Sequence, residues 1–320
     1  MIDPRRLAVL RALADHRTVT AAASALHLTP SAVSQQLAAM EAEVGQPLLE
    51  RRGRTVRLTR AGEILAVHAG AVAAQLERAE AELAAHTQGT SGEVTVAAFA
   101  TAIGLVVAPA IASLATAEPQ VDVRVRDAEG NVSLPMLVEG EVDIAITPEY
   151  RGALRDDERI TRVSLFVEPF DAVLPGDHRL AGDRDIAITA LAADRWVTPW
   201  PGNPCHDVVQ LACEHAGFEL RPGCLSDDFR AVTALVAAGA GVALVPRSAL
   251  HGVTLAGAVR RPLNGSPPTR RVFAALRRGS EHHPLHAAVL DALRAAAPDA
   301  GGPAEAQATG SPAGCAEAPS

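Results

Sequence analysis

Apolar side chains recur at helical period near the start of the chain, and they predict two short helices joined by a turn within residues 18–45. The apolar residues of the second helix follow the spacing i, i+4, i+7 and i+11: Val33, Leu37, Met40 and Val44. Thr29 and Pro30 are suited to begin this helix, and Gly45 is suited to end it. The first helix has small side chains that allow a close crossing: Ala22, Ala23 and Leu26.

The side of the second helix opposite the apolar stripe carries no charge, whereas the water-facing side of a surface helix usually does. Its residues are Ser31, Gln35, Ala38 and Ala42. A glutamine can form two hydrogen bonds with adenine, a serine can bond to any base edge, and an alanine can touch the thymine methyl group. The pattern favours readout of the DNA major groove. An ordinary helical hairpin with an alanine-rich solvent face is the alternative.

The segment after Pro47 adds a second DNA-binding feature. Residues 55–59 alternate between apolar and polar as in a strand, and Arg52, Gly53 and Arg54 form a plausible turn before it. The pattern predicts a winged helix-turn-helix domain whose arginine-bearing wing lies against phosphates. Residues 1–60 hold nine arginines against five acids, whereas the whole chain has a net charge of −8. Contact with a polyanion is therefore expected at this end only.

Residues 61–88 are expected to form one long helix, because apolar and small residues alternate there in steps of four and three. The seam consists of Leu65, Ala69, Val72, Leu76, Ala79, Leu83 and His86. Such a seam is typical of a coiled coil, and it predicts a dimerisation helix with Leu65, Val72, Leu76 and Leu83 at the contact. Packing of this helix onto its own chain is the alternative. Residues 87–92 read as a flexible link.

The pattern then changes to short β-rich runs separated by helical stretches, which predicts mainly parallel sheets covered on both faces. Strands are expected near 93–98, 121–126, 142–147, 160–166, 170–174, 195–198, 242–246 and 271–277. Helices are expected at 102–116, 205–217, 228–239 and 283–297. The segment Val167–Phe170 resembles a crossover between two lobes. The expected domains are a winged helix-turn-helix DNA-binding domain at 1–60, a linker helix at 61–90, an effector domain at 91–297 and a disordered tail at 298–320.

Composition removes several classes of function. The chain has no lysine, so the lysines of P-loops, kinases and Schiff-base enzymes are excluded. A structural zinc site is not expected, because the four cysteines form no CxxC pair. No other metal and no cofactor are expected either. The histidines at 282, 283 and 286 are interpreted as a solvated patch rather than a metal site. Without a run of about 20 apolar residues or a signal segment, the protein is expected to be cytoplasmic and not to contact a membrane.

At this point the chain resembles the LysR-type transcriptional regulators over roughly residues 3–297. The specific signatures are AAASALHLTPSAVSQQL and PLLERRGRTVRLTRAG, and the weaker ones are VDIAIT and LVAAGAGVALVP. The resemblance implies an α/β effector domain like the type 2 periplasmic binding proteins, with two lobes around a small molecule. Lobe I would span about 91–166 and 270–297, and lobe II about 167–269. It also implies a homodimer or homotetramer that binds double-stranded DNA, with contact to RNA polymerase as a further expectation.

The resemblance also assigns candidate site residues. Those expected at DNA are Thr20, Thr29, Pro30, Ser31, Ser34, Gln35, Ala38, Arg51, Arg52 and Arg54. Those expected at the effector are Phe99, Ala100, Thr101, Thr147, Thr198, Trp200, Phe229 and Arg230. The helix that would begin after Phe99 suits a carboxylate or similar anion, and Arg230 or Trp200 would clamp an acidic or aromatic ligand.

Two alternatives differ in mechanism. Some members of the family sense peroxide through two cysteines in the second lobe, near the place of Cys205 and Cys213. Apart from His206 and His215, however, no basic residue lies close in sequence to lower the pKa of either thiol. A metabolic α/β enzyme is the other alternative, but the Gly239–Gly241 segment lacks the third glycine of a dinucleotide-binding loop, and neither GxSxG nor HExxH occurs.

Overall fold

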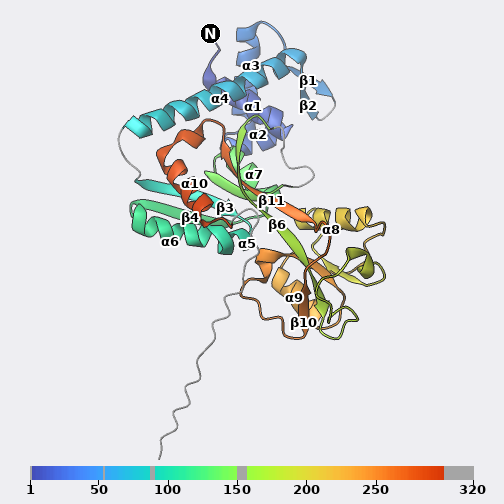
Figure 1. Ribbon diagram of the computed structural model, residues 1–320. Coiled ribbons are helices and arrows are strands. Elements are labelled where there is room, and N and C mark those ends of the chain that lie inside the picture. The colour runs from blue at the N-terminus through green and yellow to red at the C-terminus, as the bar shows by residue number, and fades with distance from the viewer. Residues whose placement is uncertain (1, 53–54, 87–90, 150–156, 299–320) are drawn as a thin grey trace, which may run out of the picture.

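The computed structural model describes residues 2–52, 55–86, 91–149 and 157–298. A small, mostly helical head lies at one end, one long helix runs from it, and two lobes that share strands form the rest (Figure 1). We call the lobe next to the head lobe I and the distal one lobe II.

The head consists of three helices and a two-stranded wing. Their bounds are α1 (Pro4–His16), α2 (Val19–Ala25), α3 (Pro30–Val44), β1 (Leu49–Arg52) and β2 (Thr55–Leu58). Thr18 and Thr29 cap α2 and α3 by accepting backbone N–H bonds, and Gly45 ends α3 in the left-handed region that favours glycine. The Glu41 carboxylate accepts the backbone N–H groups of Leu48 and Leu49, at 2.8 and 3.0 Å, and so fixes the wing to α3.

The long helix α4 (Arg60–His86) touches both the head and lobe I. Its first turns pack on α1, where Ala69 is buried and Leu65 joins the core of the head. Further on it lies against the short turn Ser280–His282 of lobe I. There a Cβ atom on Gly279 would collide with the Ala74 carbonyl oxygen, so the two backbones are in direct contact.

Lobe I is a sheet covered by helices on both faces. Its strands are, in spatial order, the first half of β6 (Ile160–Pro175), β11 (Thr269–Arg277), β5 (Ile144–Pro148), β3 (Gly92–Ala98) and β4 (Val121–Asp127). Its helices are α5 (Ala100–Ala102), a π-helical turn (Ile103–Val107), α6 (Ala108–Ala117), α7 (Gly130–Glu139) and α10 (Pro284–Ala296). The core under α6 and α10 contains the inward residues of β3 and β11.

Lobe II is built around the second half of β6. That half pairs with β9 (Ala243–Pro246) and β10 (Ala258–Arg261), while β7 (Trp196–Thr198) pairs with β8 (Pro222–Leu225). The helices α8 (Pro204–His215) and α9 (Phe229–Ala237) pack against these strands. Since β6 runs through both lobes and β11 pairs with it as far as Pro169, the two lobes are joined by two strands.

Several details differ from the sequence predictions. The strands expected at 160–166 and 170–174 are one strand, β6, because it continues through the crossover. The expected mainly parallel arrangement is wrong: β3 pairs in parallel with β4 and β5, but the crossover strands β6 and β11 pair antiparallel with their neighbours. The helix α7 was not predicted, since Gly130 and Pro135 interrupt its pattern. The short strands β8 and β10 were also missed.

One stretch of lobe I, Ala100–Ala117, is apolar and long enough to cross a membrane by length and composition. Its residues Ala102, Val106, Val107 and Leu114 are buried in the core of lobe I. The stretch is thus a helical segment that covers the sheet of lobe I, and its apolar composition serves that packing.

Candidate functional site

The exposed face of α3 carries the side chains expected at DNA bases. Ser31, Ser34, Gln35 and Ala38 are all exposed, while Val33, Leu37 and Met40 on the other side are buried. The predicted division of the helix into a core side and a free side is therefore present. Thr20 of α2, and Thr29 and Pro30 at the start of α3, are exposed as well.

The hydroxyl groups at the start of α3 already have local partners. Thr29 Oγ1 lies 3.1 Å from Ser31 Oγ, and Ser34 Oγ donates to the Pro30 carbonyl at 2.9 Å. For Gln35, no hydrogen bond occurs within the described residues, so its amide is available to a ligand. The wing arginines Arg51 and Arg52 lie at the end of β1, where Arg52 pairs with Thr55 across the hairpin. Arg54 lies outside the described residues.

The seam predicted on α4 is divided between two environments. Leu65 and Ala69 pack into the head of the same chain, which is the alternative weighed for this helix. Further along, Val72, Leu76 and Leu83 are exposed by 36%, 56% and 67%. Apolar side chains exposed to this extent along one helix mark a surface suited to association.

A cleft of about 860 Å³ opens between the two lobes. This size lies within the usual range for small-molecule sites. Its lining comes from the ends of β3 and β4, the turn after α5, and the starts of α8 and α9. Of the residues expected at the effector, Phe99, Ala100, Thr101, Phe229 and Arg230 line it. The other lining residues that carry polar groups are Asp127, Glu129, Asn203, Cys205, Asp227, Asp228, Ser248, His251 and Arg270.

Three expected effector residues lie elsewhere. Thr147 and Thr198 are fully buried, and each hydroxyl donates to the carbonyl of the following proline. Trp200 is 55% exposed, outside the lining, and its backbone N–H donates to Asp227. Phe99 and Thr101 lie in the cleft lining, as their position after a predicted strand suggested, and the same rule applied to the strand ending at Asp127 points to Glu129.

Arg270 lies at the base of the cleft, almost fully buried, and connects both lobes. Its guanidinium forms an ion pair with Glu168 of β6 at 2.6 Å and donates to Thr101 of lobe I at 2.8 Å. On the side of lobe II it lies 3.3 Å from Ser248 Oγ and 3.4 Å from the Cys205 sulfur. It also covers the ring of Phe99. Sequence reasoning missed Arg270 because its partners are distant along the chain.

The cysteines Cys205 and Cys213 are buried in α8, as expected for free thiols. Burial raises the pKa of Cys205 to about 11 and that of Cys213 to about 12. The structure adds a cation that the sequence did not reveal, since Arg270 contacts the Cys205 sulfur. The two cysteines are eight residues apart on one helix, about 12 Å along its axis. A disulfide needs Cα atoms closer than about 7 Å, so α8 would have to unwind.

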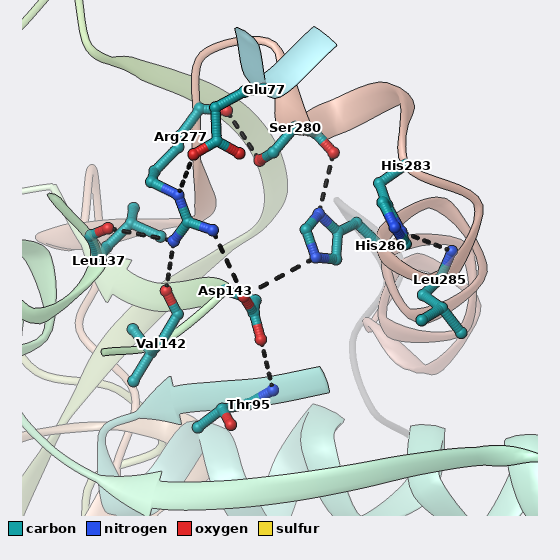
Figure 2. Close-up of polar contacts among 10 residues, drawn as sticks. All are labelled: Glu77, Thr95, Leu137, Val142, Asp143, Arg277, Ser280, His283, Leu285 and His286. Carbon is teal, nitrogen blue, oxygen red and sulfur yellow. Dashed lines mark hydrogen bonds and ion pairs between the residues drawn. The ribbon is translucent and has the colours of Figure 1, made fainter. Parts of the chain in front are cut away.

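The predicted solvated histidine patch is wrong for His286, which is buried in lobe I (Figure 2). Its Nδ1 donates to the Ser280 carbonyl at 2.9 Å, and its Nε2 lies 3.9 Å from Asp143. Asp143 in turn accepts the backbone N–H of Thr95 and pairs with Arg277. Within the described residues no group of three or more histidine, cysteine or acidic side chains is arranged to hold a metal ion.

Comparison with known proteins agrees with this geometry. Residues 4–63 match the family model "Bacterial regulatory helix-turn-helix protein, lysR family", and residues 87–298 match "LysR substrate binding domain". The chain is 32% identical over 247 residues to a probable hydrogen peroxide-inducible genes activator of Mycobacterium avium, covering 75% of this chain and 76% of that protein. It is 27% identical over 287 residues to the RuBisCO operon transcriptional regulator of Allochromatium vinosum, with 88% and 92% covered.

Solved structures show the same fold. A full-length OxyR variant of Pseudomonas aeruginosa matches with a TM-score of 0.65 at 23% identity, covering 93% of this chain and 97% of that one. Full-length CbnR complexed with its target DNA matches with a TM-score of 0.55 at 23% identity, covering 92% and 99%.

A winged helix-turn-helix head joined by one helix to a two-lobed domain defines a DNA-binding regulator with an effector domain. Since the two family models together cover most of the chain, it belongs to the LysR family of transcriptional regulators. The family and fold class predicted from the sequence are therefore confirmed.

Proposed function

We propose that this regulator reads its operator with the exposed face of α3 and that Gln35 contacts a base. The observation that carries the proposal is the position of the Gln35 amide, exposed on the side opposite the buried residues Val33 and Leu37. A free amide can form two hydrogen bonds with adenine in the major groove. The neighbouring hydroxyls of Ser31 and Ser34, and the Ala38 methyl group, supply further contacts along the same face.

Binding of Gln35→Ala to the operator and to random DNA tests the assignment. The operator is first located by footprinting upstream of the regulator's own gene and of its neighbour. We expect a loss of about 1–3 kcal/mol at the operator and relaxed specificity at one base pair. Gln36→Ala, at the next and partly buried position, is the matched control. An equal loss on operator and random DNA would show that Gln35 does not read a base.

We propose further that two chains associate through the exposed part of α4. Val72 and Leu76 present apolar surface there, and a dimer would place two α3 helices on half-sites about one DNA turn apart, or a multiple of that. Leu76→Glu is expected to shift the protein to a smaller species in sedimentation velocity. Glu82→Gln, a charge change elsewhere on the helix, is the control. Unchanged sedimentation of Leu76→Glu would contradict the assignment.

In the effector domain, we propose that a small molecule in the cleft between the lobes changes DNA binding or promoter activity. Gly104 lines the cleft, and a Cβ atom there would have nothing within 4 Å. A side chain can therefore begin at this position without a clash at Cβ, and Gly104→Phe is designed to narrow the cleft. The variant is expected to fold and bind DNA but to lose the reporter response to small metabolites. A full response in Gly104→Phe would refute the proposal. As a DNA-binding regulator of this family, the protein is further proposed to act in the cytoplasm and to catalyse no reaction.

Thiol redox sensing is the second candidate, favoured by the contact of Arg270 with Cys205 at the cleft wall. The Mycobacterium avium relative is named as a hydrogen peroxide-inducible activator. The raised pKa of both thiols and the helical separation of Cys205 from Cys213 favour ligand control instead. Peptide mass spectrometry after mild peroxide decides the question. Absence of a Cys205–Cys213 disulfide ends the redox candidate.

A further inference from the structure

The positive charge at the base of the cleft is already neutralised. Arg270 is only 3% exposed, and its guanidinium is paired with Glu168 and hydrogen-bonded to Thr101. Glu168 also accepts the N–H and the hydroxyl of Ser248, at 2.9 and 3.0 Å. A buried arginine with this many partners holds the lobes together, and it has little charge to offer an anionic ligand.

The cleft contains more carboxylates than its one remaining arginine can neutralise. Four carboxylates line the cleft, two from each lobe: Asp127, Glu129, Asp227 and Asp228. Arg230, at the start of α9, is the one other arginine among the described lining residues. The cleft therefore has a negative balance, opposite to that required for an acidic effector.

Of these four carboxylates, Glu129 is the partly buried one, and the other three are exposed. Glu129 precedes α7 as the N-cap residue, yet its side chain makes no capping bond. Among the described residues, no hydrogen bond or ion pair engages this partly buried carboxylate. Burial raises its pKa; the charge of Arg270 opposes the shift, and the charges of Asp227 and Asp127 add to it. A partly buried carboxylate without a bonding partner, with the charge of a second acid from the opposite lobe acting on it, is unfavourable for the folded protein.

Asp227 lines the same cleft from lobe II and has a defined orientation. Its Oδ1 accepts the backbone N–H of Trp200 and the Asn203 amide, both at 3.0 Å. These two bonds hold the carboxylate in place at the cleft lining. The apolar part of the lining includes Phe99, Leu105, Phe229 and Val253. Such a wall suits the alkyl or aryl body of a small molecule.

We infer that the effector carries an ammonium or guanidinium group that binds between Glu129 of lobe I and Asp227 of lobe II. The inference rests on the proposed role of the cleft and names the ligand class of that site. A cation there would satisfy Glu129, remove the repulsion between the lobes and draw them together. It replaces the anionic ligand that sequence reasoning favoured.

Thermal shift and titration calorimetry on the full-length protein test the inference. The cationic probes are 1,4-diaminobutane, agmatine and L-lysine, and the anionic probes are succinate and benzoate. We expect a cationic probe to raise the melting temperature and Glu129→Gln or Asp227→Asn to weaken its binding about tenfold or more. Asp227→Asn retains the oxygen that accepts from Trp200, so the local fold is preserved. Glu219→Gln, an exposed site on lobe II, is the matched control.

The outcomes separate this inference from the proposed function. Stabilisation by none of the cations, or cation binding that Glu129→Gln leaves unchanged, overturns the inference. Binding of succinate or benzoate that Gly104→Phe abolishes also overturns it, while the regulatory role of the cleft stands. A metabolite response that survives in Gly104→Phe contradicts the role of the cleft itself.

Discussion

Arg277, the last residue of β11, donates from its Nε to a carboxylate oxygen of Glu77 in the long helix α4 at 2.9 Å (Figure 2). Arg270, the second residue of the same strand, lies at the base of the cleft. One strand therefore has its two ends at the two places that a ligand-controlled regulator has to connect. Around Arg277, the carbonyls of Leu137 and Val142 accept from the guanidinium, and Asp143 pairs with it.

Replacement of Arg277 is expected to destabilise lobe I and its contact with α4. Arg277→Ala leaves the carbonyls of Leu137 and Val142 without this donor and removes the cation between Glu77 and Asp143. We expect a loss of about 2–4 kcal/mol in the free energy of unfolding, measured by urea denaturation. Arg278→Ala, at the adjacent exposed position, is the control. Equal stability of the two variants would mean that the Arg277 contacts contribute nothing.

Stability is expected to fall on mild acidification because of His286. Burial lowers the pKa of this side chain; its bond to Ser280 and the charge of Asp143 oppose the shift, and His283 and Arg277 add to it. The neutral ring is thus favoured in the folded state. Its contribution is complete above the unfolded pKa of about 6.5 and is lost as the pH falls towards the lowered folded value. Unfolding free energies between pH 5 and pH 8 measure this.

His286→Gln should remove part of the pH dependence of the unfolding free energy, while His251→Gln, on lobe II, should not. A wild-type protein whose stability changes with pH no more than that of His286→Gln would disprove the assignment.

Replacement of Arg270 is expected to lower the free energy of unfolding more than replacement of an exposed arginine. Arg270→Met would leave Glu168 buried without its cation, which costs about 3–5 kcal/mol. The double variant Arg270→Met/Glu168→Gln should regain part of this, since the uncompensated charge is then gone. Arg271→Met, on the exposed neighbour, serves as the control in thermal and chemical unfolding. If the double variant were the less stable one, the penalty would not come from the orphaned carboxylate.

The wing is expected to bind phosphates without regard to sequence. Arg52→Ala should weaken binding to operator and random DNA alike and reduce the slope of log affinity against log salt by about one. Arg184→Ala, an exposed arginine of lobe II, should leave the slope unchanged. A normal slope in Arg52→Ala would exclude a phosphate contact at this position.

The head was predictable because its signals are local. The apolar stripe of α3, its Thr29 cap and the Gly45 stop lie within one short segment, and each acts on its own neighbours. For the long helix α4 the sequence gives the period of the seam but not its partner. The structure assigns Leu65 to the head and leaves Leu76 exposed.

The cleft was only partly predictable because its polar contacts join distant segments. Phe99 and Thr101 follow a strand that the pattern reveals, so their position could be inferred. Arg270 meets Glu168, 102 residues away, and Thr101, 169 residues away, and no spacing encodes such contacts. His286 shows the same limit, since its burial depends on Asp143 and on the turn at Ser280.

The backbone contact at Gly279 has a consequence for how the molecule can evolve. Because no side chain separates Gly279 from the Ala74 carbonyl, the spacing between α4 and lobe I is at its minimum, and its φ of +100° already disfavours other residues. Even a methyl group at this position would force either the α4 backbone at Ala74 or the turn before Ser280 to shift. One residue, outside the cleft lining and the exposed face of α3, therefore limits how closely lobe I can pack against the helix that carries the head.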